Sequence, residues 1–209
     1  MHNAYINVDN RKMSKSLNNF FTVRDVAAKY SYNVIRFFLL SAHYRSPMNF
    51  SDALMEASKS GLERITTCVS NLDFLMGNAK EEGLDKAFAE KMDSFREAFK
   101  AGMDDDLNTA DGIAAIFDAV KEANSKANEL SKESLAYAKA LITELCSVLG
   151  VIAEEEKEDL DSKVEALIKE RAEARSAKNY KRADEIRDEL KAMGIVLEDT
   201  AQGVKWKKA

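Results

Sequence analysis

The chain has 209 residues, of which 45% are hydrophobic and 32% charged, enough for one large or two modest domains around an apolar core. One proline and eight glycines favour a mostly helical protein, and we find neither an apolar run long enough to span a membrane nor a signal-peptide pattern. Two cysteines are too few for a disulfide framework, and with His2 and His43 they give no metal-ligand spacing, so we predict no metal site in this chain. Cys68 and Cys146 fall on apolar stripes, which predicts two buried, unreactive thiols in a cytoplasmic protein.

The net charge of −5 is unevenly distributed along the chain. Residues 1–50 hold seven Lys and Arg against two acids (+5), residues 51–160 hold twelve against 24 (−12), and residues 161–209 hold twelve against ten (+2). A polyanion would be attracted to the two ends and repelled by the middle. This pattern fits a partner that bridges two sites, whereas solubility of acidic helices explains the middle but not the ends.

The stretch Lys12-Met13-Ser14-Lys15-Ser16, called the signature loop below, follows an alternating run, Tyr5–Val8, and an Asp9–Asn10 turn signal. We expect a strand followed by a mobile loop. Two ammonium groups three residues apart, with small hydroxyls between them, suit a polyphosphate, because lysine is a compact charge on a flexible stem. Two lysines alone would equally describe a solvated basic loop.

Two short helices are predicted next. Thr22 and Asp25 have the spacing of a capping box, which predicts a helix to about Tyr30. Ser31 caps a second helix, which His43–Pro47 ends. The apolar face of this second helix is expected at Ile35, Phe38 and Leu39. Two cations of this region suit phosphate contacts, although surface arginines are common: Arg36 and Arg45.

Four amphipathic helices are predicted in the middle of the chain. The first runs from Ser51 to Met76 and ends at Gly77–Asn78. The apolar stripes of the other three are Phe88, Met92, Phe95 and Phe99; Ile113, Ile116, Phe117 and Val120; and Leu141, Leu145, Val148, Leu149 and Ile152. Short polar links between such helices favour an antiparallel bundle with these side chains in its core.

The acidic run Asp104–Asp106 precedes Asn108-Thr109 and has two interpretations. Acidic residues and a cap at a helix start would satisfy free N–H groups and the helix dipole. A cation site is the alternative, but adjacent side chains rarely converge on one ion.

A second domain is predicted after Glu154–Asp161, an acidic run that reads as a protease-sensitive linker. A helix follows, and its predicted face begins with apolar residues and ends with two arginines. A turn at Lys178–Asn179 leads into a second, antiparallel helix that ends at Gly194. The two faces are Val164, Ile168, Arg171 and Arg175, and then Ala183, Ile186, Leu190 and Met193. Ile195–Leu197 and Val204–Trp206 flank a turn and predict a β-hairpin.

Five residues of the signature loop match the signature of class I aminoacyl-tRNA synthetases, and further stretches resemble the cysteinyl-tRNA synthetase family in particular. These stretches are Leu17–Val26, Ala42–Ser46, Met103–Thr109, and Gly194–Asp199 with Gln202, Gly203 and Trp206. They occur in the family's order and span almost the whole chain. The HIGH-type motif and the cysteine/histidine zinc site of this family lie upstream of the signature loop and do not occur here. The resemblance therefore implies the C-terminal portion of such an enzyme.

The resemblance implies a mostly α fold in four parts. Residues 1–21 would be the end of a Rossmann-type catalytic domain with the signature loop, and residues 22–50 would be stem-contact helices. Residues 51–158 would form the helical bundle, and residues 159–209 a small α+β anticodon-binding module. The complete protein would be a monomer without a membrane partner.

The resemblance also implies a reaction, in which the complete enzyme ligates cysteine to tRNA(Cys) with ATP through cysteinyl-adenylate. Lys15, and secondarily Lys12, would stabilise the charge of the departing pyrophosphate, with Ser14 as a further ATP contact. Zinc would bind the substrate thiol through residues outside this chain. The 209 residues alone are therefore expected to be inactive.

For the tRNA anticodon, the resemblance points to five residues: Arg175, Tyr180, Asp184, Asp199 and Trp206. Exposed aromatic side chains beside cations suit stacked, single-stranded bases. Asp199 occupies the position of the family's guanine-reading aspartate, and a carboxylate can accept from both donors of guanine's Watson–Crick edge. The family usually holds tryptophan at the Tyr180 position, which would weaken stacking here. Alternatively, Trp206 pins the hairpin to the helices and Asp199 closes the turn.

Two other functions stay open from the sequence. A related ligase joins cysteine to an amino sugar in mycothiol synthesis, but that family lacks an anticodon module, so the segment Val164–Trp206 argues against it. A non-catalytic helical tRNA-binding or interaction protein with a chance signature loop is the other. A pure interaction protein predicts no salt-dependent binding to tRNA.

Overall fold

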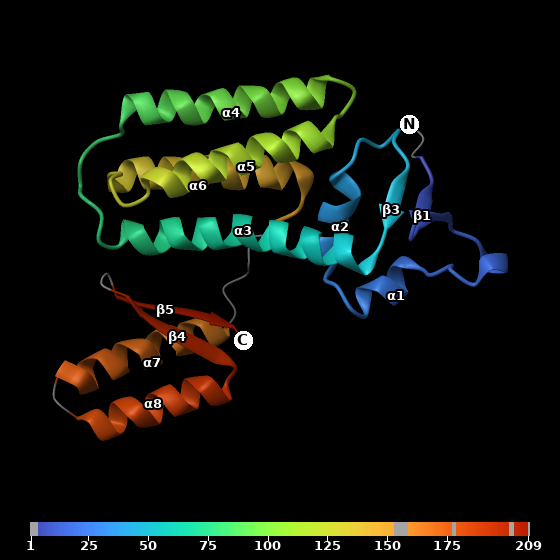
Figure 1. Ribbon diagram of the computed structural model, residues 1–209. Helices are drawn as coiled ribbons and strands as arrows, with labels where there is room; N and C mark the ends of the chain where they lie inside the picture. The colour runs from blue at the N-terminus through green and yellow to red at the C-terminus, as the bar shows by residue number, and fades with distance from the viewer. Residues whose placement is uncertain (1–3, 153–158, 177–178, 201–202, 209) are drawn as a thin grey trace. The chain divides into compact units, whose positions relative to one another are not determined.

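The computed structural model describes residues 4–152, 159–176, 179–200 and 203–208, with only the backbone described at residues 159–163, 165, 198–200, 203–205, 207 and 208 (Figure 1). The chain divides into two units, Met1–Ala153 and Glu154–Ala209. Most of the predicted linker, Glu154–Asp161, lies outside the described residues. Among the helices of the described part, none is long and apolar enough to cross a membrane.

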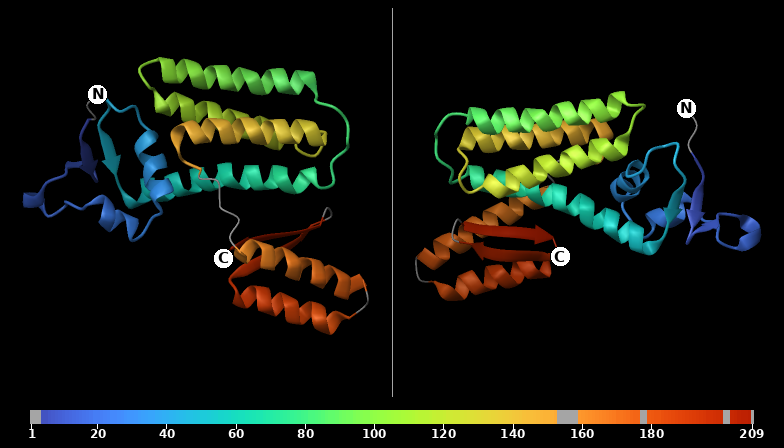
Figure 2. Two further views of the ribbon diagram at one scale, coloured as in Figure 1. Left: turned by 180° about the vertical axis from the view of Figure 1, so that it is seen from behind. Right: turned by 45° about the horizontal axis from the view of Figure 1, so that its top comes forward.

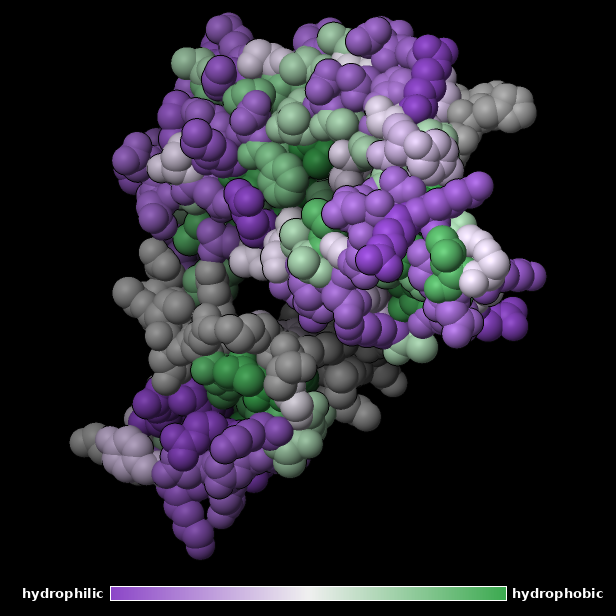
Figure 3. Space-filling view, turned by 45° about the vertical axis from the view of Figure 1, so that its right-hand side comes forward, coloured by the Kyte–Doolittle hydropathy of each residue, from purple (hydrophilic) through white to green (hydrophobic). Residues whose placement is uncertain are grey.

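The first unit contains the predicted four-helix bundle. Its helices are α3 (Asp52–Met76), α4 (Lys86–Asp104), α5 (Thr109–Lys126) and α6 (Lys132–Leu149). Successive helices run in opposite directions, and α4 packs mainly on α5 while α3 packs mainly on α6 (Figures 1 and 2). In the space-filling view, hydrophilic side chains dominate the visible face and hydrophobic side chains show between them (Figure 3). The predicted mostly α fold with a helical bundle is confirmed.

Most of the predicted apolar stripes form the core of this bundle. Buried members are Phe88, Met92, Phe99, Ile113, Ile116, Val120, Leu141, Leu145 and Leu149. Phe95, Phe117 and Ile152 are partly buried against the same core. The prediction is wrong for Val148, which is 61% exposed, and for Leu39 of the preceding helix, which is 41% exposed. Both residues follow or precede a buried stripe position and therefore fall at the edge of the apolar face.

Both cysteines are buried in this core, as predicted. Cys68 lies on α3 and Cys146 on α6. Burial raises the pKa of the Cys68 thiol to about 11 and that of Cys146 to about 12. Since the thiolate is the reactive form, neither side chain is a nucleophile near neutral pH.

Two short helices precede the bundle, and their predicted caps are confirmed. Thr22 and Asp25 form a reciprocal capping box at the start of α1 (Val23–Ala27), and the backbone N–H of Thr22 lowers the pKa of Asp25. Ser31 caps α2 (Tyr32–Leu40). Helix α1 ends earlier than predicted, because Ser31 is already extended as the next cap and Tyr30 turns inward to donate to Glu56.

A small sheet stands beside these helices. Its strands are β1 (Ile6–Val8), β2 (Arg11–Lys12) and β3 (Met48–Phe50), in the order β2-β1-β3. Strand β1 is antiparallel to β2 and parallel to β3, with Ile6 opposite Met48. A parallel pair is typical of α/β domains, which agrees with the predicted end of a Rossmann-type domain. Strand β3 was not predicted.

The second unit has a helical hairpin and a β-hairpin, as predicted. Its elements are α7 (Asp159–Ser176), α8 (Tyr180–Ala192), β4 (Ile195–Thr200) and β5 (Gly203–Lys208). Gly194 separates α8 from β4 with a φ of +75°, a backbone conformation that favours glycine. The core contains Val164, Ile186, Leu190 and Ile195. Arg171 is 6% exposed, so the buried face of α7 extends to this cation.

The acidic run Asp104–Asp106 does not start a helix. Asp104 is the last residue of α4, and α5 begins at its predicted cap, Asn108, which accepts from the Asp111 N–H. The dipole interpretation of the run is therefore wrong, because carboxylates at a helix C-terminus are disfavoured. Within the described part of the chain, no group of three or more His, Cys, Asp or Glu side chains could hold a metal ion.

Candidate functional site

The signature loop begins inside a strand. Lys12 is the last residue of β2 and lies opposite Asn7 of β1, so the loop proper starts at Met13. The turn before β2 is tight, with Asp9 and Asn10 both at positive φ (47° and 63°), a conformation that Asp and Asn tolerate better than most residues. The predicted turn at these two residues is confirmed, whereas the prediction that Lys12 lies in a loop is wrong.

Two polar side chains hold the loop in shape. Ser14 caps a single 3₁₀ turn, Lys15–Leu17, by accepting from the Ser16 N–H. Asn19 closes the loop, because its Nδ2 donates to the Lys12 carbonyl (3.1 Å) and its Oδ1 accepts from the Ser14 N–H (2.8 Å). Sequence reasoning did not single out Asn19, since an asparagine that braces a loop from outside it leaves no spacing pattern.

The two lysines of the loop are available for an anion. Both side chains are exposed, and neither forms an ion pair with any residue that the structure describes. The Lys15 ammonium lies 5.4 Å from the centroid of the Phe20 ring, a cation–π contact that leaves its outer side open. The Ser14 hydroxyl lies 2.7 Å from that of Ser16, so it points within its own loop.

The arginines considered for phosphate contacts have protein partners nearby. Arg45 lies 2.9 Å from Asp106 and its guanidinium stacks over the Tyr44 ring. Arg36 lies over Gly150, at the C-terminal end of α6, where a cation complements the helix dipole.

Several predicted anticodon residues lie at one end of the second unit. The end of α7, the start of α8, the end of β4 and the start of β5 share that end (Figures 1 and 2). Arg175 is in the last turn of α7, and Tyr180 opens α8 with 62% of its surface exposed. Asp184 follows one turn later on α8, where it lies 3.6 Å from Arg187. Asp199 pairs with Val204, beside the last pair of the hairpin, Thr200 and Gly203.

Trp206 lies further along the hairpin, opposite Leu197. It is partly buried against the apolar cluster of the second unit, which supports the interpretation that it pins the hairpin. Its intermediate burial also leaves part of the indole accessible.

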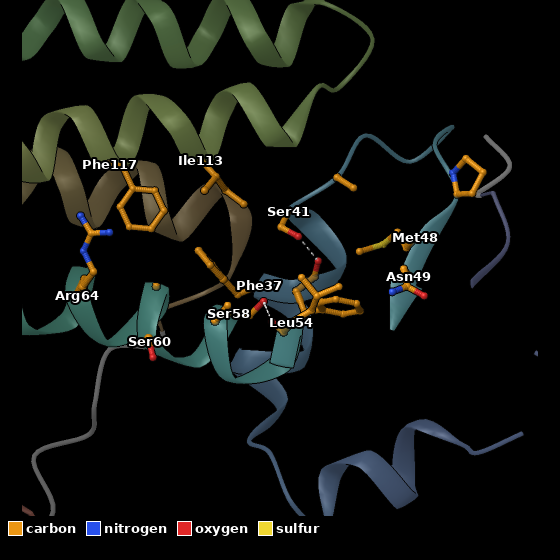
Figure 4. A pocket seen from close by; sticks show the side chains of 15 residues that line it. Phe37, Ser41, Met48, Asn49, Leu54, Ser58, Ser60, Arg64, Ile113 and Phe117 are labelled. Carbon is orange, nitrogen blue, oxygen red and sulfur yellow. Dashed lines mark hydrogen bonds between the residues drawn. The ribbon is translucent and has the colours of Figure 1, made fainter. Parts of the chain in front are cut away.

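A groove of about 700 Å³ lies in the first unit, away from every predicted site residue. Figure 4 shows Arg64 and Phe117 on one side of it and Met48 and Asn49 on the other. The Arg64 guanidinium lies 5.0 Å from the centroid of the Phe117 ring. The residues that line the groove are mostly apolar, and none of them is a predicted site residue.

Zinc does not fit the described residues. The two cysteines are enclosed in the bundle core with raised pKa values, and no metal-binding group forms in the described ranges. We therefore derive no step through zinc.

Three family models match the chain in order. They describe the class I tRNA synthetase (C) catalytic domain over residues 1–60, the DALR domain over residues 98–153, and the cysteinyl-tRNA ligase anticodon-binding domain over residues 157–206. A solved leucyl-tRNA synthetase ternary complex from Agrobacterium radiobacter K84 has 25% identity and a TM-score of 0.58, covering 69% of this chain and 20% of that one. The signature loop, the small mixed sheet and the helical bundle that follows, together with these matches, place the chain among the class I aminoacyl-tRNA synthetases.

The curated relatives of the chain identify its family within this class. The cysteine–tRNA ligases of Lachnospira eligens and Halalkalibacterium halodurans are 53% and 50% identical to the whole chain. With the anticodon-binding model, these matches show that the chain belongs to the cysteinyl-tRNA synthetase family, corresponding to its C-terminal portion. The chain spans 45% of the length of each of these two relatives. The matches give no support to the mycothiol-type ligase or to an interaction protein.

Proposed function

We propose that this chain supplies the phosphate-binding signature loop and the tRNA-binding parts of a cysteine–tRNA ligase. The complete protein would join cysteine to tRNA(Cys) at the expense of ATP, in the cytoplasm and as a monomer. The observation that carries this proposal is a pair of exposed lysines on a braced loop, in one chain with a match to the family's anticodon-binding domain. Residues 22–50 would contact the tRNA stem and residues 51–158 would connect the two sites.

The chemistry at the loop follows from its charges. In adenylation, a carboxylate oxygen of cysteine bonds to the α-phosphorus of ATP, the bond to the β-phosphate oxygen breaks, and its electron pair leaves with pyrophosphate. Negative charge therefore grows on the leaving group in the transition state. Lys15, and secondarily Lys12, would stabilise this charge, with Ser14 as a further donor, and such contacts raise the rate more than they strengthen substrate binding.

The chemistry at the anticodon rests on the end of the second unit. Arg175 would pair with phosphate or a base edge, and the exposed ring of Tyr180 would stack on a base. Asp199 would accept from the N1–H and the exocyclic amine of guanine, the first anticodon base for cysteine. Asp184 and Trp206 would add a polar contact and a stacking surface.

The proposal is tested by the binding of this chain to tRNA(Cys) and to a transcript with the first anticodon base altered. We expect Asp199→Ala to lose about 1–3 kcal/mol of discrimination between the two transcripts, the usual scale of a bidentate base contact. Affinity for both should also fall steeply between about 50 and 200 mM salt, because phosphate contacts release counterions.

Asp188→Ala is the matched control, because Asp188 is an exposed carboxylate of the same unit outside the predicted site. It should leave the preference between transcripts unchanged. If Asp199→Ala lowers the melting temperature while the preference persists, Asp199 is a turn residue. If the chain shows no salt-dependent binding to tRNA, the proposed function is wrong.

A further inference from the structure

The loop between α4 and α5 has an unfavourable backbone conformation. Asp106 and Leu107 both adopt a φ of +55°, in the left-handed region. Leucine is rarely found there, and such residues persist where the surrounding contacts determine their conformation. The contacts of the α4–α5 loop should therefore show which interactions keep Asp106 and Leu107 in this conformation.

The Asp106 carboxylate is the meeting point of three consecutive residues from the α2–β3 connection. Tyr44 Oη donates to Oδ1 (2.9 Å), and Arg45 Nη1 lies 2.9 Å from Oδ2. His43 Nε2 lies 3.7 Å from Oδ2, and its ring stacks on that of Tyr44. Close by, the Thr109 hydroxyl donates to the Leu40 carbonyl (2.7 Å), at the end of α2. The α4–α5 loop thus contacts the α2–β3 connection through Asp106, and the start of α5 contacts the end of α2 through Thr109.

The same connection holds the strands that carry the signature loop. The Tyr44 carbonyl accepts from the Ala4 N–H (2.8 Å), and the Met48 N–H donates to the Tyr5 carbonyl (3.1 Å). From there, β3 pairs with β1, and β1 pairs with β2, which contains Lys12. A continuous series of hydrogen bonds therefore runs from Asp106 to the first lysine of the signature loop.

From this arrangement we propose that Asp106 is a positioning residue for the signature loop. By binding Tyr44 and Arg45, it fixes the β1–β3 pair against the bundle and so sets where Lys12 and Lys15 stand. The activity part of this inference rests on the proposed function, whereas the positional part does not.

The neighbouring carboxylates provide a comparison within the same loop. Asp104 and Asp105 are exposed, and their side chains make no hydrogen bond or ion pair with a residue in the described ranges. A negative charge in this loop is therefore not sufficient for the contacts with Tyr44 and Arg45, which are made by Asp106.

Hydrogen exchange of the purified chain tests the position of the strands. Asp106→Gly removes the carboxylate and adopts a positive φ without strain, so the loop can keep its backbone path. We expect faster exchange at the amides of Ala4, Met48 and Asp9, all of which are hydrogen-bonded around the sheet, with α3 and α6 unchanged. Asp105→Gly is the matched control and should change none of them. Unchanged exchange at the sheet, or faster exchange throughout the unit, would overturn the proposal.

Kinetics of the complete enzyme test the consequence. Asp106→Gly and Tyr44→Phe should each lower the kcat of cysteine-dependent ATP–pyrophosphate exchange about tenfold with KM for cysteine unchanged, and the double variant should lose no more than either alone. Additive losses, or a change in KM alone, would overturn the coupling of Asp106 to the loop. If the unaltered chain does not bind tRNA, that result counts against the proposed function. It does not affect the hydrogen-exchange test of where Asp106 holds the strands.

Discussion

The two lysines of the signature loop differ in how their backbone is held. Lys12 is fixed in the β2 ladder opposite Asn7 and its carbonyl accepts from Asn19. Lys15 begins a single 3₁₀ turn and rests against the exposed ring of Phe20. Lys15 can therefore follow a moving phosphate more freely than Lys12, because the ammonium of Lys12 can change position only by rotation about its side-chain bonds.

This difference predicts an asymmetric mutational response in the complete enzyme. Lys15→Ala should lower the rate of adenylation about 100-fold with little change in KM for cysteine, because its contact would belong to the transition state. The rate of ATP–pyrophosphate exchange over a range of cysteine concentrations measures both quantities.

Lys100→Ala is the control for loss of a positive charge, since Lys100 is an exposed residue of α4 paired with Glu97. It should leave the rate unchanged. Equal losses in rate and cysteine affinity for Lys15→Ala would contradict a transition-state role.

Single residues were predictable where their role is local or where a motif marks them. The caps Thr22, Ser31 and Ser51 were found in this way, and a motif marks the two lysines of the signature loop as candidate site residues. Asn19 and Asp106 were not, because their roles depend on partners that no local pattern reveals; Tyr44 and Asp106 are separated by 62 residues.

At the scale of elements, helices were predictable and short strands were not. An apolar face repeated over several turns is a strong signal, and it located α3 through α6. Strand β3 has three residues, so it offers too few alternations to distinguish it from a loop, and its pairing with β1 is decided by tertiary contacts.

The contact between α4 and α5 depends on two glycines that the apolar pattern does not reveal. A Cβ at Gly102 would lie 3.2 Å from the backbone N of Gly112 and 3.1 Å from Cβ of Asp111. Gly112 in turn faces the ring of Phe99. These glycines let the two helix backbones approach closely, and backbone atoms cannot move aside as a flexible side chain does.

Gly102→Ala is therefore expected to destabilise the first unit by about 1–3 kcal/mol, the usual cost of inserting a methyl group into a close-packed contact. Urea denaturation followed by helical circular dichroism would measure it.

Gly77→Ala is the matched substitution, because a Cβ there has one neighbour at 3.4 Å and the residue has a φ of −62°. It should be neutral or stabilising by up to about 1 kcal/mol. Equal effects of the two substitutions would contradict the close approach of α4 and α5.

At the scale of the whole molecule, the chain carries its predicted sites on separate units. The signature loop is in the first unit, and the predicted anticodon residues are in the second. The division into a bundle and a small α+β unit could be read from the change in periodicity after residue 160. The assignment of each unit to a role could not, because it came from resemblance rather than from spacing.

We expect the 209-residue chain by itself to bind tRNA(Cys) but to show no cysteine-dependent ATP–pyrophosphate exchange, since it corresponds to 45% of either relative. Both measurements should use the same preparation, so that tRNA binding demonstrates a folded protein. Measurable exchange from this chain would show that the signature loop and its neighbours are sufficient for adenylation.

The parallel pairing of β1 with β3 has a consequence for how the first unit folds. Helices α4 and α5 are neighbours in sequence and can associate after closing a short loop. Strands β1 and β3 meet only when Ile6 reaches Met48, with α1 and α2 between them. Closing that longer segment costs more chain entropy, so the α4–α5 pair should form faster than the sheet. Substitutions that slow refolding should therefore lie in α4 and α5, whereas substitutions in β1 and β3 should mainly speed unfolding. The sheet that carries Lys12 would then form after α4 and α5 have paired, and it would separate before they do.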